Sequence, residues 1–171
     1  MDALDSLTPI VYSGALWRTS SPNRDPLLGG TGGGRWSVPG STEALYTSLE
    51  ANTSLSELYY HLSTAPVFSS MPVQLCEIRA NKLSVLDLRD GGLLKNLGID
   101  DPASTSSQYL DKSRAIGAIA EFLEFHGIIV PSVRTNGDNL VLYPGNLDLN
   151  ENLKVIQQQD INWPAWVAKR E

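Results

Sequence analysis

Short segments rich in β-branched and aromatic residues run through most of this chain, and turn-forming residues separate one from the next. Segments of this kind are typical of strands, which Gly, Pro and Asn interrupt. The expected strands cover residues 9–12, 15–19, 44–48, 73–78, 83–88, 128–130 and 140–143. Because only two stretches between them have a clear helical pattern, the sequence predicts an α+β fold with a mixed or antiparallel sheet.

The first helical stretch follows the strand expected over residues 44–48. Apolar residues recur on one of its faces at the helical spacing, namely at Leu55, Leu58, Tyr59 and Leu62. Ser54 and Glu57 have the spacing of a capping box, which predicts that the helix begins at Ser54. At about 100° per residue, Glu57 projects away from the apolar face. That position fits the wall of a cleft and fits open solvent equally well.

The second helical stretch is expected over residues 112–126. Gly127 follows it directly, and glycine is the residue type that most often stands just after a helix. His126 is therefore interpreted as a C-terminal capping residue rather than a metal ligand. Further on, Asn136-Gly137 predicts a hairpin between the last two expected strands, because this dipeptide favours the tightest hairpin turns.

The length of 171 residues favours one domain. We expect its core to span about residues 10–147, and the acidic, amide-rich tail, residues 148–171, to pack on that core as a strap. The apolar end of the tail, Trp163-Pro164-Ala165-Trp166, fits either closure of the core or an interface with another chain.

The charge balance argues against nucleic acid as a direct partner. The formal net charge is -6 and the pI is near 4.9, whereas proteins that bind duplex DNA carry a basic face. No segment approaches the roughly 18 continuous apolar residues of a membrane span. The N-terminal residues are acidic, unlike those of a signal peptide, so we expect a cytoplasmic protein without membrane contact.

Cysteine and histidine are too scarce for a metal site of the usual kind. Cys76 is the only cysteine, so no disulfide forms within the chain, and a reducing compartment fits. The two histidines, His61 and His126, are far apart in the sequence and build no zinc spacing. We therefore expect no bound metal.

A glycine-rich loop covers residues 20–40 and includes Gly29-Gly30 and Gly32-Gly33-Gly34. A Walker loop needs Gly-Lys-Ser/Thr, and a Rossmann turn needs a helix directly after the glycines. Here the glycines lead into Arg35-Trp36 and then an expected strand, so both classes are excluded. What remains is a long loop that presents an arginine, with Trp36 interpreted as a core residue.

Several motifs together carry a family resemblance. They are Trp17-Arg18, Gly34-Arg35-Trp36-Ser37-Val38-Pro39-Gly40, Leu45-Tyr46-Thr47-Ser48, Ser54-Leu55-Ser56-Glu57-Leu58, Val130-Pro131-Ser132-Val133-Arg134 and Asn139-Leu140-Val141-Leu142-Tyr143. In this order, and with Arg35, Tyr46 and Glu57 spaced eleven residues apart, they resemble a RES domain over about residues 10–147. Two positions depart from the family pattern, since Trp17 stands where tyrosine is expected and Ser37 where asparagine is common.

The resemblance implies a fold similar to that of ADP-ribosyltransferase toxins. It also implies that NAD is the substrate and that the nicotinamide–ribose bond is broken by phosphorolysis or hydrolysis, with inorganic phosphate as a co-substrate in the first case and no bound cofactor. Such a protein is a toxin. Its partner is a helix-turn-helix antitoxin of the Xre type that covers the cleft, in a complex that can hold a toxin dimer.

The resemblance also implies roles for five residues. The catalytic set is Glu57, Arg35 and Tyr46, and the substrate-binding set is Arg18, Arg35, Tyr46 and Ser132. A carboxylate at Glu57 suits the positive charge that develops on the ribose. The arginines suit a diphosphate or an attacking phosphate, and Tyr46 suits stacking on a cationic nicotinamide ring. The Ser132 hydroxyl suits a hydrogen bond to the ribose or the carboxamide rather than nucleophilic attack.

Each residue also has an ordinary structural interpretation. The Ser54–Glu57 pair alone is explained by a helix cap. Either arginine is explained by a surface ion pair, and Ser132 by a turn. At the level of the whole chain, transfer of ADP-ribose to a protein or nucleotide acceptor and a non-catalytic binding module remain open beside NAD degradation.

Overall fold

The computed structural model describes residues 7–63 and 72–170. Their strands form one six-stranded sheet, which confirms the expected α+β class. The strands are β1 (Ile10–Ser20), β2 (Leu45–Ser48), β3 (Val73–Asp87), β4 (Gly127–Pro131), β5 (Asp138–Leu142) and β6 (Leu153–Ile161). The helices are α2 (Ala51–Ser63), α3 (Gly91–Asn96), α4 (Ser107–Phe122), α5 (Leu149–Asn152) and α6 (Trp163–Ala168), with a 3-10 turn at Pro144–Asn146.

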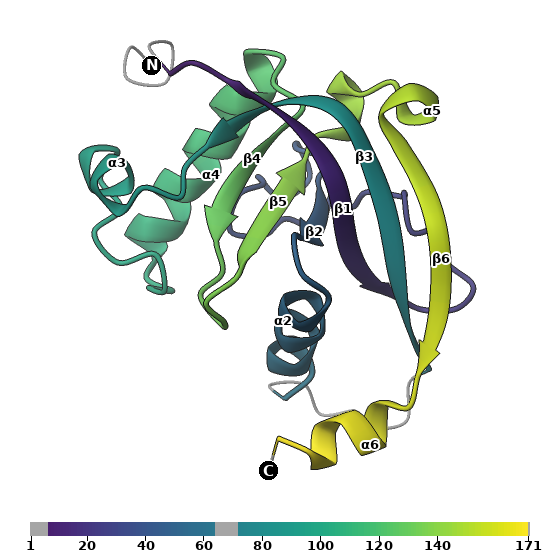
Figure 1. The fold of residues 1–171 in the computed structure, drawn as a ribbon. Helices are drawn as coiled ribbons and strands as arrows, with labels where there is room; N and C mark the ends of the chain where they lie inside the picture. Colours follow the sequence, from purple (N-terminus) through teal and green to yellow (C-terminus); the bar gives the residue numbers. More distant parts are fainter. Residues whose placement is uncertain (1–6, 64–71, 171) are drawn as a thin grey trace.

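The sheet closes on itself. Its order is β1-β2-β5-β4-β3-β6, and β1 also pairs with β3, so the first five of these strands form a closed circuit with β6 attached to β3 (Figure 1). Only the β3–β4 pairing is parallel. The mixed sheet is therefore as expected, but its closure was not predicted.

Two pairs of expected strands are single long strands. Residues 9–12 and 15–19 fall in β1, which shifts register between Tyr12 and Gly14. Residues 73–78 and 83–88 fall largely in β3, which bends at Lys82, where φ is +50°. The strand continues between the two segments because Arg79 and Ala80 pair with both β1 and β6.

The predicted start of the first helix is wrong. Helix α2 begins at Ala51, and the Ser54 amide donates to the carbonyl of Glu50, so Ser54 lies within the first turn rather than at the cap. The capping box is therefore absent, and Glu57 is available for other partners. The predicted apolar face is confirmed, because Leu55, Leu58 and Leu62 pack in one hydrophobic cluster.

The predicted end of the second helix is also wrong. Helix α4 ends at Phe122, and the chain turns at Glu124, where φ is +61°. Gly127 instead begins β4, where a Cβ atom would lie 2.4 Å from the carbonyl oxygen of Val141. His126 is not a cap, because its Nδ1 accepts a hydrogen bond from the Ser84 amide of β3.

Alternating side chains build a separate cluster on each face of the sheet. All buried members of one cluster lie on strands, so it fills the inside of the circuit, with Ile129, Leu140 and Leu142 among them. The neighbouring residues Ile128 and Val141 point to the opposite face and pack against α4. Because residues 128–130 of β4 and 140–142 of β5 are buried on both faces of the sheet, each of these runs is continuously apolar.

The chain end joins α2 to the sheet. Strand β6 runs antiparallel along β3, and α6 lies next to α2 at the lower end of the molecule (Figure 1). Trp163 is 2% exposed and stacks on Trp166, with 5.1 Å between the ring centroids. Both rings pack with Leu55 of α2, so the tail closes the hydrophobic cluster beneath this helix. None of the described helices is both long and apolar enough to span a membrane.

Candidate functional site

A cleft of about 520 Å³ opens between α2, the loop before β2, and the ends of β1, β4 and β5. Four of the five residues chosen from the sequence line it, namely Arg18, Arg35, Tyr46 and Glu57. Ser132 is outside this lining among the described residues, but its hydroxyl contacts Glu57. The fold thus brings together residues that lie far apart in the sequence.

Glu57 is half-buried and is held by two neutral donors on the same oxygen. The Ser132 hydroxyl donates to Oε1 over 2.7 Å, and the Asn139 side-chain amide donates to Oε1 over 2.9 Å. Within the described part of the chain, no hydrogen bond or ion pair reaches Oε2. The carboxylate is therefore fixed in position without a cation to neutralise it.

Ser132 is fully engaged by its neighbours. Besides donating to Glu57, its oxygen accepts hydrogen bonds from the backbone amides of Arg134 (3.0 Å) and Thr135 (3.3 Å). A hydroxyl has one hydrogen and two lone pairs, so all three positions are used. In this arrangement Ser132 orients Glu57 and retains no hydrogen for a substrate.

Asn139 was missed by the sequence reasoning, which quoted it only as part of a motif. It lies opposite Ser48 in the β2–β5 pairing, and the Ser48 hydroxyl donates to its side-chain oxygen over 2.7 Å. This contact fixes the amide so that its NH₂ group points to Glu57. The usable signal was a polar residue at the start of an otherwise apolar strand.

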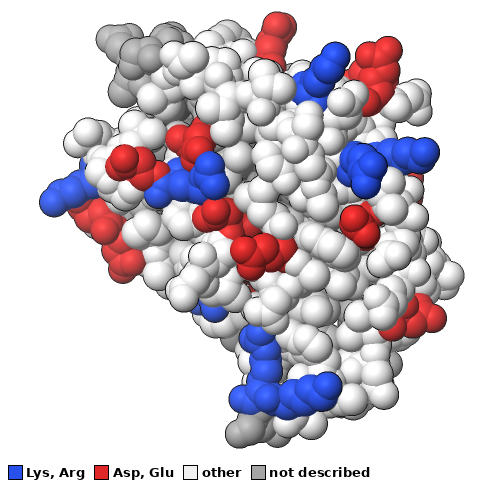
Figure 2. Space-filling view, in the orientation of Figure 1, with Lys and Arg blue, Asp and Glu red and all other residues white. Residues whose placement is uncertain are grey.

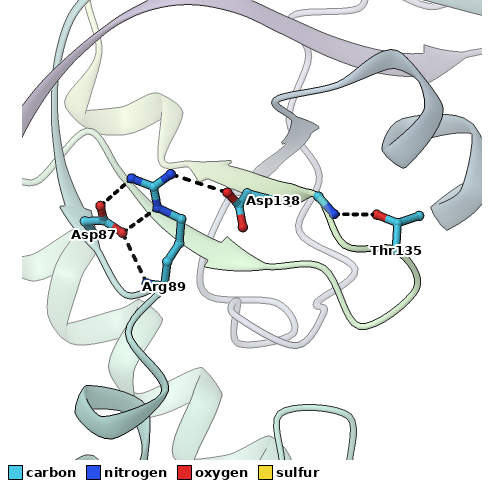
Figure 3. A network of polar contacts seen from close by, with 5 residues as sticks. Asp87, Arg89, Thr135 and Asp138 are labelled. Atoms are coloured by element: carbon cyan, nitrogen blue, oxygen red, sulfur yellow. Dashed lines mark hydrogen bonds and ion pairs between the residues drawn. The ribbon is translucent and has the colours of Figure 1, made fainter.

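The segment around Asn139 is held from both sides. On one side, Arg89 bridges Asp87, at the end of β3, and Asp138, with 3.3 Å to the latter (Figure 3). On the other side, the turn before β5 docks on α2, where Thr53 and Thr135 lie 2.9 Å apart through their hydroxyl oxygens. These contacts explain how a hairpin turn holds Asn139 in place beside Glu57.

Arg35 reaches the cleft from the glycine-rich loop. One of its Nη atoms donates to the carbonyl of Ser104 over 2.8 Å. Burial lowers the pKa of this guanidinium, and the nearby Arg134 lowers it further, while Asp101 and Glu57 act in the opposite direction. Arg35 and Arg134 thus lie close enough to repel each other.

Arg18 has a structural task that the sequence did not indicate. Its Nη1 donates to the carbonyls of Pro26 (2.6 Å) and Leu28 (2.8 Å), so it ties β1 to the loop that carries Arg35. Burial, reinforced by Arg24, lowers its pKa to about 10. Neither Arg18 nor Arg35 has an ion-pair partner among the described residues. A surface ion pair, the ordinary structural interpretation of these arginines, is therefore wrong for both.

Tyr46 is anchored through its hydroxyl, which leaves its ring partly exposed. The Trp36 amide donates to the Tyr46 oxygen over 3.0 Å, and the Ser37 hydroxyl lies 3.0 Å from the same oxygen. Burial raises the pKa of this phenol. Gly34 is required beside it, because a Cβ atom there would lie 2.4 Å from the hydroxyl oxygen. Trp36 is 4% exposed and packs in the core, as expected.

The cleft carries an excess of positive charge in an acidic chain. Its lining includes Arg18, Arg35 and Arg134 but one carboxylate, Glu57. On the face that Figure 2 shows, acidic and basic side chains are otherwise interspersed. The local field therefore suits an anionic ligand. Among the described residues, no group of three or more His, Cys, Asp or Glu side chains is arranged to hold a metal ion.

Comparisons with known proteins agree with this architecture. A chain in the crystal structure of the M. tuberculosis MbcT–MbcA toxin–antitoxin complex is similar over 99% of this chain and 95% of that chain, with a TM-score of 0.86 and 24% sequence identity. At this identity, the likeness shows the fold alone. No curated protein matches the sequence. The sequence model of the RES domain matches residues 15–164, which is most of the chain, and this protein therefore belongs to the RES domain family.

Proposed function

We propose that this RES domain is an enzyme that breaks the nicotinamide–ribose bond of NAD. The observation that carries the proposal is the state of Glu57, which is oriented through Oε1 by two neutral donors and lies in a cleft rich in arginine. A carboxylate paired with an arginine would have its charge neutralised. Glu57 has no such ion pair among the described residues and therefore suits a cationic transition state.

The reaction needs little proton transfer. When the bond between the nicotinamide nitrogen and ribose C1′ breaks, the electron pair leaves with the ring, which becomes neutral nicotinamide. Positive charge then develops on C1′ and the ring oxygen, as in glycoside hydrolysis, and Glu57 stabilises it. Water or the inorganic phosphate dianion supplies the electron pair of the new C1′–O bond. Attack by water releases one proton to the solvent, and attack by the dianion releases none.

Other cleft residues suit the remaining parts of the substrate. Arg35 supplies a planar, permanently charged donor group for phosphate oxygens. The partly exposed ring of Tyr46 offers a face for the nicotinamide, which is cationic before cleavage. Ser132 and Asn139 serve as positioning residues for Glu57, and Arg18 keeps the Arg35 loop in place.

We further propose that the enzyme is a cytoplasmic toxin controlled by an antitoxin. The structural neighbour comes from a toxin–antitoxin complex, and NAD loss would stop growth. The partner proposed here is a helix-turn-helix protein of the Xre type that covers the cleft. Co-expression should yield a complex without NAD-cleaving activity, and a complex that keeps full activity would contradict this control.

The test of the activity uses antitoxin-free protein and NAD, with and without inorganic phosphate. Nicotinamide release that requires phosphate indicates a phosphorylase, and release of free ADP-ribose without phosphate indicates a glycohydrolase. Label from the adenylate part of NAD that appears on a protein or nucleotide indicates ADP-ribosyl transfer instead. Folded protein that releases no nicotinamide under any of these conditions would overturn the proposal.

A further inference from the structure

Arg134 is a cleft residue that the function so far leaves unexplained. It follows the strand β4 and lines the cleft, with its guanidinium carbon 3.2 Å from the centroid of the Tyr60 ring. Its Nε atom is buried and has no hydrogen-bond partner among the described residues. Buried donors are normally satisfied, so an unsatisfied one in a cleft points to a ligand.

The charge around Arg134 points to an anion. After burial, Arg134 is the neighbour that most lowers the pKa of Arg35, so the two cations lie within electrostatic reach of each other. Neither forms an ion pair with any described carboxylate. Glu57 acts favourably on Arg35 without forming an ion pair with it, and its Oε1 atom is occupied by Ser132 and Asn139. An anion with two negative charges would turn this repulsion into attraction.

The geometry of each guanidinium suits phosphate oxygens. The Tyr60 ring holds the Arg134 guanidinium carbon over its face, and no hydrogen bond from the described residues occupies the N–H groups of this guanidinium, so they suit a ligand. One Nη atom of Arg35 donates to the Ser104 carbonyl, which leaves its other N–H groups for a ligand. Arg18 is less suited to the task than was expected, because two loop carbonyls already occupy its Nη1.

We propose that Arg134 and Arg35 together form a phosphate-binding subsite beside Glu57. The backbone ties the subsite to the acid, since the Arg134 amide donates to Ser132 and Ser132 donates to Glu57. Resting on the proposed function, the subsite takes either the diphosphate of NAD or the inorganic phosphate that attacks ribose. Both ligands share the same phosphate chemistry, and kinetics distinguish them.

The kinetic test compares wild type, Arg134→Met and Arg134→Lys, with Arg79→Gln as a control on an exposed arginine outside the cleft. Arg134→Met keeps the apolar stem, and we expect it to raise one KM by about tenfold to a hundredfold, with a smaller rise for Arg134→Lys. A rise in the KM for NAD assigns the subsite to the diphosphate, and a rise in the KM for phosphate assigns it to the free ion. Unchanged KM values for both in the folded variants would overturn the proposal.

A binding test separates the subsite from the proposed reaction. Pyrophosphate and inorganic phosphate are titrated against each protein and followed by its thermal unfolding temperature, with sodium chloride at equal ionic strength as the reference. We expect stabilisation of wild type and of Arg79→Gln, and little of Arg134→Met. This result supports the subsite even if NAD is not cleaved. Equal stabilisation of wild type and Arg134→Met by both anions would contradict it.

Discussion

The Ser132 hydroxyl donates to Oε1 of Glu57 over 2.7 Å, although 75 positions separate the two residues in the sequence. Ser132 belongs to the β4–β5 hairpin and Glu57 to α2, so this contact joins two separate elements at the cleft. In this orientation the carboxylate oxygen accepts, and the serine has no hydrogen left to donate elsewhere. We therefore expect Ser132 to position the acid rather than to bind the substrate directly.

Replacement of Glu57 by glutamine tests the carboxylate itself. Glu57→Gln keeps the shape and the hydrogen bonds to an oxygen but removes the charge, so we expect kcat for NAD cleavage to fall by about 10²- to 10³-fold. Glu77→Gln on β3 changes a carboxylate outside the cleft and should leave kcat unchanged. An equal loss in the two variants, or no loss in the first, would remove Glu57 from the mechanism.

Asn139→Ala tests positioning rather than chemistry. The variant frees Glu57 from one donor without touching the arginines, so kcat should fall by about tenfold or more while the KM for NAD changes little. Asn146→Ala is the matched control, because Asn146 also bridges elements, through the carbonyls of Glu121 and Phe125, but outside the cleft. If both variants lose activity only in proportion to their loss of stability, Asn139 has a structural role alone.

Gly137→Ala tests the docking of the hairpin on α2. A Cβ atom at Gly137 would lie 2.2 Å from the Thr53 hydroxyl oxygen, so the turn must move away from the helix. We expect a loss of about 1 to 3 kcal/mol in the free energy of unfolding and a fall in kcat, because Ser132 and Asn139 flank this turn. Gly145→Ala meets no atom within 4 Å and should change neither quantity, as urea unfolding and NAD assays would show.

His126 predicts a pH dependence of stability. Burial lowers its pKa below the ordinary value of 6.5, and Nδ1 must stay unprotonated to accept from the Ser84 amide. The unfolded chain therefore binds a proton at a higher pH than the folded protein does. The free energy of unfolding should fall as the pH drops below 6.5, until the pKa of the folded state is passed.

The measurement for His126 is urea unfolding between about pH 5 and pH 7.5. His126→Asn places an oxygen where Nδ1 lies and does not titrate in this range, so its stability should depend less on pH than that of wild type. The same slope in wild type and variant would show that other groups cause the dependence.

The sequence predicted the elements better than their ends. Strand composition and the apolar face of α2 follow from local physics, so residues 44–48 and Leu55 were assigned correctly. The end of α4 depends on Gly127 fitting against Val141, and the start of α2 places Ser54 inside the helix. Such boundaries are decided by tertiary packing, which short-range patterns do not contain.

The cleft was predicted in part for the same reason. Arg35, Tyr46 and Glu57 were chosen through the resemblance to the RES domain, and the structure places them on one cleft. Asn139 depends on its register opposite Ser48, and Arg134 on its stacking over Tyr60. Register and the Tyr60 contact join residues distant in the sequence, so a local pattern can mark Asn139 and Arg134 but not the partners they meet.

The position of Asn139 in the chain sets when this site can exist during synthesis. Glu57 is translated first, and its amide partner follows 82 residues later. At roughly 5 to 20 residues per second, that delay is about 4 to 16 seconds. Until it ends, the nascent chain has the acid without the complete pair of donors that orients it.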